Sequence, residues 1–354
     1  MRGAGQSSPR TRALASALAA TLAALAGTAL PAAPAAAQEA PLFRADSVVA
    51  VTLRTDLRAL FRDRDTAHAV WRQATLTYVG PDSAVAVPLR VRTRGIFRRA
   101  TCDVPPIRLR FEEKDLHGTL LNHLRRPKLV SVCRDRDDYE QLVLKEYAIY
   151  RLWRLFSPIG FSARLVRVTY EDSAGRVRPM TRFGIITEDP ERLAERLGAT
   201  IVTQSDVRIG RVNRTNVSLL GVFQYLIGNT DWAVPMRHNV ELLRTADSAL
   251  YAVPFDFDWS GLVDAPYAHP NSILHTRFVT ERVFRGVCQL RDDFVPTLEL
   301  FAARRDSVTA VLRAVPGLQP RVLQNAVRYL DEFYGDIRDP ARFWQREVET
   351  RCMW

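Results

Sequence analysis

The stretch that most constrains this chain runs from residue 225 to residue 261, where an apolar helix leads into a series of acidic and amide side chains. Residues 215–228 carry apolar side chains at helical spacing and end at Gly228, a residue type that commonly terminates helices. A helix that ends so sharply fixes where the following loop begins.

Asp231 lies in this loop, and Asn239 follows eight positions later. Two short apolar runs joined by a polar turn, residues 240–255, then predict a β-hairpin. The second strand of the hairpin leads directly into Asp256 and Asp258. An Asp-x-Asp sequence after a strand often does no more than cap a turn. Its position behind a helix and an Asp-Asn loop favours a functional site instead.

Carboxylate and amide oxygens are the ligands that Mg²⁺ prefers, and phosphoryl transfer also needs a carboxylate to orient the attacking hydroxyl. The arrangement resembles the catalytic loop and metal-binding segment of protein kinases, although the Asp231–Asn239 spacing is longer than in ordinary kinases. More specifically, it is similar to the CotH-like family of atypical secreted kinases, whose pattern reads roughly GNxD…N…PxDxD. That pattern stands here as Gly228–Asp231, Asn239 and Pro254–Asp258. Residues 92–95 match the RxRG element of the same family, and no GxGxxG motif is present.

The resemblance implies an α+β fold of two kinase-like lobes, a strand-rich N-lobe at residues 38–187 and a mainly helical C-lobe at residues 188–354. It implies transfer of the γ-phosphoryl group of ATP to Ser or Thr hydroxyls of an unknown protein substrate, with Mg²⁺. The expected roles are Asp231 as the catalytic base, Arg94 or Lys128 as phosphate ligands, and three metal ligands, namely Asn239, Asp256 and the auxiliary Asp258.

The first part of the mature chain has the alternation typical of strands. Apolar and polar residues alternate between residues 47 and 111, which predicts an antiparallel, strand-rich region. Two further strands are predicted at 165–170 and 182–187, followed by a kinase-like hinge near residues 186–189. Helical spacing returns after residue 292 and predicts two helices, with a third one after them.

Residues 127–133 predict a strand with Lys128 at its start, and residues 139–156 predict a helix. Glu146 falls on the apolar face of that helix, where a buried carboxylate needs a cation. Kinases pair a strand lysine with a helix glutamate to hold phosphates, so Lys128 and Glu146 are candidate partners. The alternative is that Glu146 pairs with an arginine in a purely structural role.

Residues 1–37 have the composition of a signal peptide: three arginines, an Ala/Leu-rich stretch and a small-residue cleavage site before Gln38. An exported, soluble protein without a stable membrane span is therefore expected. The formal net charge is +11, or +8 without Arg2, Arg10 and Arg12. The arginines are spread along the chain and are not interleaved with aromatic residues in one run, so nucleic-acid binding is not favoured.

Four cysteines allow three disulfide connectivities. Cys102 and Cys133 lie in the first half, and Cys288 and Cys352 lie in the second, so pairing within each half is favoured. A rival interpretation from another class is an exported binding, adhesion or surface protein on a kinase-like scaffold without catalysis. A metal-dependent hydrolase ranks last, because the histidines usual at such sites are lacking.

Overall fold

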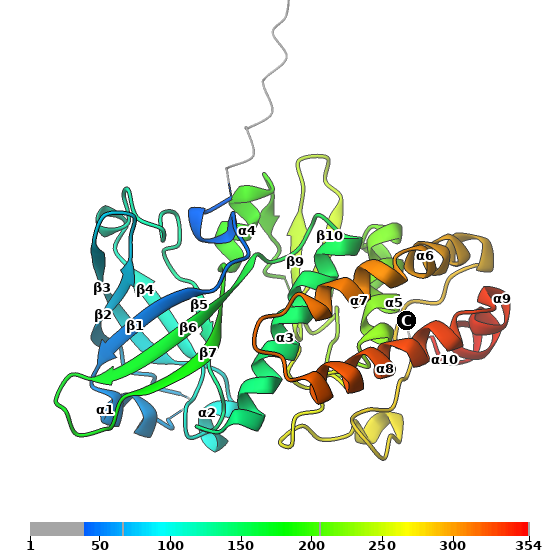
Figure 1. The fold of residues 1–354 in the computed structure, drawn as a ribbon. Helices are drawn as coiled ribbons and strands as arrows, with labels where there is room; N and C mark the ends of the chain where they lie inside the picture. The colour runs from blue at the N-terminus through cyan, green and yellow to red at the C-terminus, as the bar shows by residue number, and fades with distance from the viewer. Residues whose placement is uncertain (1–38, 66, 205–206, 353–354) are drawn as a thin grey trace, which may run out of the picture. The chain divides into compact units, whose positions relative to one another are not determined.

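The computed structural model describes residues 39–65, 67–204 and 207–352, and the predicted signal peptide lies outside them. Seven strands pair around a closed barrel in the order β1-β2-β3-β4-β5-β7-β6 (Figure 1). Their bounds are β1 Val49–Thr55, β2 Arg72–Val79, β3 Ala84–Thr93, β4 Ile107–Phe111, β5 Lys128–Val130, β6 Ala163–Asp172 and β7 Met180–Thr187. The alternation predicted for this region is confirmed, since Val87, Leu89 and Val91 of β3 are buried.

The antiparallel pairing predicted for residues 47–111 is confirmed, because β1 to β4 pair antiparallel in sequence order. Strands β1 and β6 pair in parallel, with Val51 opposite Val168, while the other six pairs are antiparallel. A ring with an odd number of strands cannot alternate direction all the way round. Closing seven strands into a barrel therefore requires one parallel pair.

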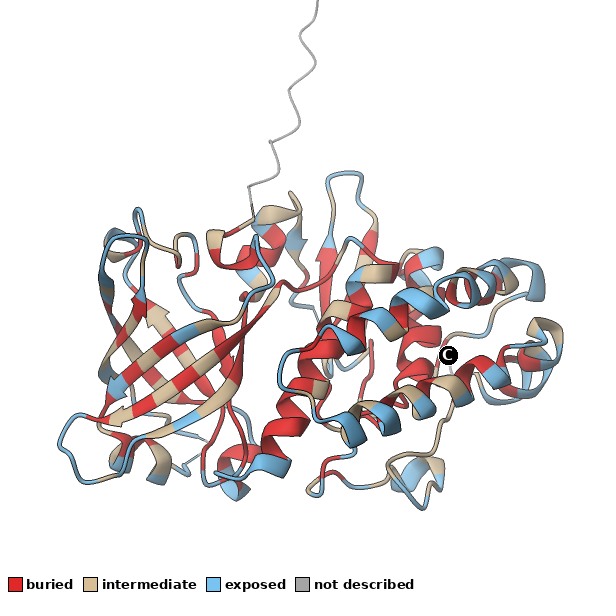
Figure 2. Ribbon diagram, viewed as in Figure 1, coloured by how far each residue is buried: buried red, intermediate tan, exposed pale blue. Residues whose placement is uncertain are grey.

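The long helix α3 (Asp137–Phe156) packs against β6 and β7 on one side and against α7 (Arg305–Arg313) on the other. It is buried along most of its length (Figure 2). Its first turn carries Asp137, Asp138 and Glu140, which favour a helix N-terminus. The structure thus confirms the predicted helix and extends it by two residues.

The connection from β3 to β4 contains α2 (Phe97–Thr101), a short helix that the sequence analysis did not predict. It ends at Cys102, which forms a disulfide with Cys133, shortly before α3 begins. The second disulfide joins Cys288 to Cys352. Both pairings agree with the predicted connectivity. The first of them ties α2 to the start of α3.

A second, smaller sheet pairs β8 (Thr200–Ile201), β9 (Val240–Arg244) and β10 (Leu250–Pro254). The predicted hairpin is confirmed, with Val240 opposite Pro254. Helix α5 (Arg214–Leu226) packs against β10 and α6 (Arg291–Ala303). The helix therefore brings the loop that follows it to the end of the hairpin.

The remaining helices lie mainly after residue 290. Helix α6 ends where Arg304 interrupts the pattern, so the two helices predicted here are in fact three. Asp339 caps the next helix, accepting a hydrogen bond from the backbone N–H of Arg342. Within the described ranges, no helix is long and apolar enough to cross a membrane. The helical bounds not yet given are α1 Leu57–Arg62, α4 Pro190–Arg196, α8 Pro320–Asp336, α9 Pro340–Phe343 and α10 Glu349–Arg351.

Candidate active site

The end of α5 fixes the candidate catalytic loop. Gly228 has a φ of +63°, and a Cβ at this position would lie 1.9 Å from the Tyr329 hydroxyl, so the position requires glycine. Asn229 is buried and donates a hydrogen bond of 3.0 Å to Gln224 of the helix. Its side-chain oxygen accepts a hydrogen bond of 2.9 Å from the backbone N–H of Asp231. These contacts anchor Asp231 to the preceding helix.

Asn239 returns to Asp231 despite the long spacing between them. Ala233 and His238 exchange two backbone hydrogen bonds and close the intervening residues into a tight loop. The Asn239 side-chain nitrogen donates to the backbone carbonyl of Asp231 at 2.8 Å and to its Oδ2 at 2.9 Å. The side-chain oxygen of Asn239 is then the atom available to a cation.

His238 is the second partner of the Asp231 carboxylate. Its Nε2 lies 2.7 Å from Asp231 Oδ1. The hydrogen bond to Asp231 raises the pKa of His238, and burial opposes this only in part. The imidazole and the Asn239 amide thus hold both oxygens of Asp231, whose side chain is one-third exposed. This is the geometry of an oriented, solvent-accessible base.

The hairpin delivers Asp256 beside Asn239. The backbone N–H of Phe255 donates to the Asn239 carbonyl at 3.0 Å, and Asp256 follows with a φ of +61°. Its own N–H donates to the Tyr150 hydroxyl of α3 at 3.2 Å. Arg94 lies 3.5 Å from the Asp256 carboxylate. The predicted residues Arg94, Asn239 and Asp256 are therefore brought together, although they come from distant parts of the sequence.

Asp258 and Glu146 occupy a buried cluster with Arg98 of α2. The Arg98 guanidinium lies 3.5 Å from Asp258 Oδ2, and both side chains are less than a tenth exposed. Burial and the neighbouring Asp256 raise the pKa of Asp258 to about 6. Burial, then Asp258, also raises the pKa of Glu146. One oxygen of each carboxylate is buried without a hydrogen-bond partner.

The predicted ion pair between Lys128 and Glu146 is not formed, and neither residue has an ion pair with another described residue. Instead the Lys128 ammonium lies 4.2 Å from the centre of the Phe255 ring. Burial and the nearby Arg94 lower the pKa of Lys128 to about 7. The cation with the largest effect on Glu146 is Arg98. Glu146 therefore lies near an arginine, as in the alternative, but forms an ion pair with neither cation.

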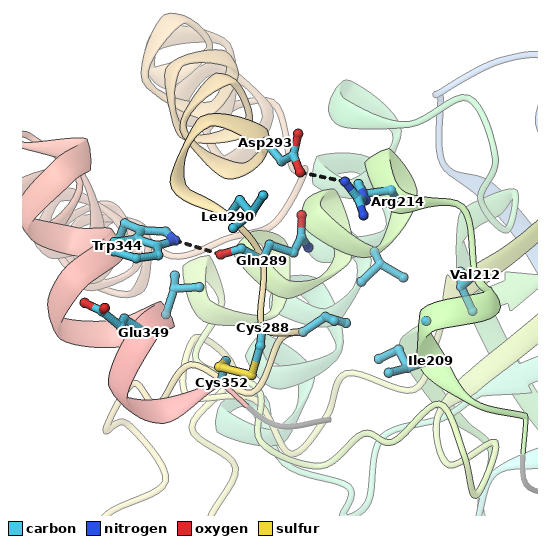
Figure 3. Close-up of a pocket in the computed structure, with 14 residues that line it drawn as sticks. Ile209, Val212, Arg214, Cys288, Gln289, Leu290, Asp293, Trp344, Glu349 and Cys352 are labelled. Atoms are coloured by element: carbon cyan, nitrogen blue, oxygen red, sulfur yellow. Dashed lines mark hydrogen bonds and ion pairs between the residues drawn. A yellow bond between two sulfur atoms is a disulfide. The ribbon is translucent and has the colours of Figure 1, made fainter.

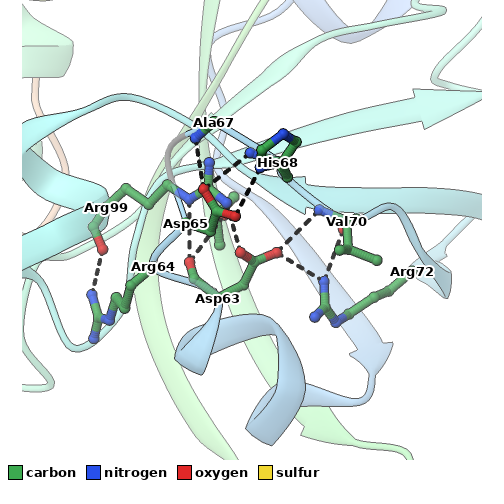
Figure 4. Close-up of polar contacts among 9 residues, drawn as sticks. Asp63, Arg64, Asp65, Ala67, His68, Val70, Arg72 and Arg99 are labelled. Atoms are coloured by element: carbon green, nitrogen blue, oxygen red, sulfur yellow. Dashed lines mark hydrogen bonds and ion pairs between the residues drawn. The ribbon is translucent and has the colours of Figure 1, made fainter.

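Arg99, which follows Arg98 in α2, is bound to a network of polar contacts around Asp63 (Figure 4). Arg99 donates to Asp63 Oδ1 at 2.6 Å, and Asp63 also binds the Arg72 side chain at 3.1 Å. Arg98 itself donates to the Ser131 carbonyl beyond β5. Burial alone would lower the pKa of Arg98, but the neighbouring Tyr267 and Asp258 raise it overall. Its guanidinium is therefore a permanent positive charge within the cluster.

Arg98 was missed by the sequence analysis, although one signal pointed to it. Two consecutive arginines precede Cys102, and the favoured partner of that cysteine stands just before the Glu146 helix. The disulfide therefore implied that the arginines lie near this helix. Only the structure shows which of the two arginines faces the carboxylates.

Asp256 and Asn239 fit a magnesium ion that keeps substrate phosphates and water in its coordination shell, because Mg²⁺ commonly uses only one or two protein carboxylates. Across residues 39–65, 67–204 and 207–352, no group of three or more His, Cys, Asp or Glu side chains is arranged to hold a metal. Asp258 already lies against Arg98. The donor set therefore fits a metal bound jointly with a phosphate ligand and does not fit an all-protein metal cage.

A cavity of about 680 Å³ lies elsewhere, beside the Cys288–Cys352 disulfide (Figure 3). Trp344 donates to the Gln289 carbonyl at its edge. Arg214 and Asp293 form an ion pair of 2.6 Å there. None of the candidate site residues lines this cavity. It is therefore separate from the candidate active site.

Comparisons with known proteins add little to this geometry. No protein-family model matches the chain, and no curated protein matches it. One solved structure, described as the Helicobacter pylori proinflammatory kinase CtkA, is similar with a TM-score of 0.37 and 11% sequence identity. The alignment covers 76% of this chain and 92% of that one. A similarity this distant carries no argument about function, and the CotH-like resemblance stays a prediction.

Proposed function

We propose that this protein is a kinase-like phosphotransferase that moves the γ-phosphoryl group of ATP to a protein Ser or Thr hydroxyl with Mg²⁺. One observation carries the proposal: Asn239 binds Asp231 through its side chain and the Asp256 strand through its backbone. Asn239 therefore contacts both the proposed base and the segment that carries the proposed metal ligand Asp256. The two-lobed division at residue 187 belongs to the same proposal.

In the proposed mechanism, Asp231 accepts a hydrogen bond from the acceptor hydroxyl and takes its proton as the new oxygen–phosphorus bond forms, while the bond from the γ-phosphorus to the β–γ bridging oxygen breaks and ADP leaves. His238 and Asn239 hold the carboxylate during this step. Asp256 and the Asn239 side-chain oxygen would hold Mg²⁺, which neutralises charge on the donor phosphates when it is bound. Asp258 acts through Arg98 and keeps the strand end in position.

The test is Mg²⁺-dependent ATP binding by the oxidised mature protein, measured by calorimetry, with mass spectrometry to detect phosphorylated Ser or Thr. Asp256→Asn preserves the size of the side chain and removes its charge, so it should abolish the Mg²⁺ dependence. Asp231→Asn should retain nucleotide binding and lose phosphate transfer by a factor of at least 10³. If folded wild-type protein binds no ATP with Mg²⁺, the proposal is wrong.

Export belongs to the proposal as well. The two disulfides support it, because disulfides persist mainly in oxidising compartments. Cleavage before Gln38 would be detected by sequencing the N-terminus of secreted protein. A mature protein that keeps residues 1–37 would contradict this part.

A non-catalytic binding protein is the second candidate, and one observation favours it. Arg94 and Arg98 lie against Asp256 and Asp258, so cations of the protein already neutralise both carboxylates. A scaffold without metal chemistry would need such pairs. The magnesium experiment separates the two functions, because only the phosphotransferase binds ATP more tightly with Mg²⁺ than without it.

A further inference from the structure

Three cations form one row across the outer face of the barrel. Arg92 of β3 lies directly opposite Arg108 of β4 in the strand register, and Arg108 lies directly opposite Lys128 of β5. The next residues along these strands, such as Val91 and Leu109, are buried in the barrel core. Side chains alternate between the two faces, so the three cations share the outer face. Neighbouring strands lie about 4.8 Å apart, so the row spans about 10 Å.

The row has no carboxylate to balance it at close range. Among the described residues, Arg92, Arg108 and Lys128 form no ion pair. Arg92 instead stacks over the Trp71 ring, with its guanidinium carbon 4.6 Å from the ring centre. Arg108 donates to the backbone carbonyl of Arg126 at 3.2 Å. Like charges placed opposite each other destabilise a sheet, so this arrangement costs stability unless an anion binds.

The acidic groups that act on Arg108 already have other partners, as do Asp256 and Glu241, which act on Lys128. Asp189 and Glu191 act on Arg108 only at longer range. Asp189 accepts the backbone N–H of Arg192 at the start of α4. Glu191 pairs with the Arg126 side chain at 3.3 Å. Neither carboxylate therefore serves the row directly.

Burial and neighbouring cations lower the pKa of two members of the row. Burial and then Arg94 lower the pKa of Arg108 to about 10. Burial, Arg94 and Arg108 together lower the pKa of Lys128 to about 7. A bound anion would reverse both effects, because it stabilises the protonated forms.

One end of the row lies at the candidate active site. Lys128 is buried, and the rings of Phe255 and Phe161 lie 4.2 and 5.6 Å from its ammonium. Phe255 immediately precedes Asp256, and Arg94, two residues beyond Arg92, lies against that carboxylate. From this closed end the row leads outward to the half-buried Arg108 and Arg92. A linear anion that reached Asp256 would therefore extend along the row.

We propose that Arg92, Arg108 and Lys128 form a binding site for a short chain of linked phosphate groups, such as the triphosphate of a nucleotide. Guanidinium groups bind phosphate oxygens in pairs, and a lysine acts as a compact charge at the closed end. The site does not need a glycine-rich loop. Identifying the ligand as the nucleotide donor rests on the proposed function, whereas the phosphate site itself does not.

The test uses inorganic tripolyphosphate as the probe, without Mg²⁺ and at constant ionic strength, in calorimetric titrations of the oxidised protein. Arg108→Gln should weaken binding at least tenfold, and Arg92→Gln should weaken it severalfold. The matched control is Arg54→Gln, which removes an exposed arginine from β1 of the same barrel and should change binding less than twofold. Circular dichroism and thermal unfolding confirm that each variant is folded.

The outcomes separate the sources of the anion. Competition between ATP and tripolyphosphate, with equal losses in Arg108→Gln, supports the nucleotide as the ligand. Tripolyphosphate binding without ATP binding supports the phosphate site and contradicts the proposed phosphotransferase. Wild-type affinity in the folded Arg108→Gln variant overturns the site. Equally tight binding of an oligoglutamate also overturns it, since the row would then select charge and not phosphate.

Discussion

The loop around Asp231 and the cluster around Asp258 are two acidic regions of one candidate site, and they are stabilised in different ways. In the loop, both oxygens of Asp231 have hydrogen-bond partners and the side chain is one-third exposed. In the cluster, Asp258 and Glu146 each keep a buried oxygen without a hydrogen-bond partner. The loop depends on local hydrogen bonds, whereas the cluster depends on one buried guanidinium, that of Arg98.

This difference matches the division of roles in the proposed function. A base that exchanges protons with an acceptor needs access to solvent and substrate, and Asp231 has it. A carboxylate that only positions a strand can be buried, provided that a permanent charge offsets it. Substitutions in the cluster should therefore affect folding first. Substitutions in the loop should affect chemistry with little loss of stability.

The largest effect is expected for Arg98→Met, which leaves Glu146 and Asp258 buried without their cation. Breaking a buried ion pair on one side typically costs about 3–5 kcal/mol of the free energy of unfolding. Urea unfolding monitored by circular dichroism would measure the loss. The matched control adds Glu146→Gln and Asp258→Asn to Arg98→Met, and it should recover most of the stability. A loss below about 1 kcal/mol for Arg98→Met would show that the cluster does not depend on this charge.

Loss of the two disulfides should also have different effects on stability and on binding. Replacing either pair by alanines removes a cross-link worth about 2–5 kcal/mol. The Cys288–Cys352 pair closes a separation of 64 residues against 31 for Cys102–Cys133, so its loss should cost about 0.6 kcal/mol more. Only the loss of Cys102–Cys133 should also weaken tripolyphosphate binding, because that disulfide holds the segment between Arg92 and Lys128. Equal effects of both replacements on binding would contradict this distinction.

Lys128 should make stability depend on pH. Its pKa is lowered to about 7, chiefly by burial, then by Arg94 and Arg108, while Asp256 and Glu241 oppose the shift. Unfolding restores a higher pKa, so the unfolded chain binds one more proton above pH 7. Stability should therefore rise with pH by about 1.4 kcal/mol per unit, or about 2 kcal/mol between pH 7 and 8.5.

Urea unfolding at these two pH values measures the effect, and Lys128→Met is the control that should remove the rise. A wild-type slope equal to that of Lys128→Met would show that the lysine keeps its proton in the folded protein.

The sequence could predict the features that lie within one continuous stretch, but not the contacts between distant segments. The helix end at Gly228, the hairpin and the Asp231–Asn239–Asp256 order are encoded within one continuous stretch, and spacing revealed them. Arg98 and the cation row come from strand pairing between distant segments, which periodicity does not specify. The prediction of a Lys128–Glu146 ion pair was wrong for this reason. It rested on analogy with kinases, because the sequence does not show which cation the barrel places beside the helix.

The smallest effect is expected at His238, on the exposed side of the loop. The Asp231 hydrogen bond raises the pKa of His238, and NMR titration of its ring protons should show a value above the usual 6.5. Asp231→Asn should return that pKa towards 6.5, because the neutral amide no longer stabilises the imidazolium. His238→Ala should cost less than about 1 kcal/mol of stability, since the pair is partly exposed. If the pKa of His238 is unchanged in Asp231→Asn, the imidazole does not orient Asp231, and Asn239 alone must hold the base.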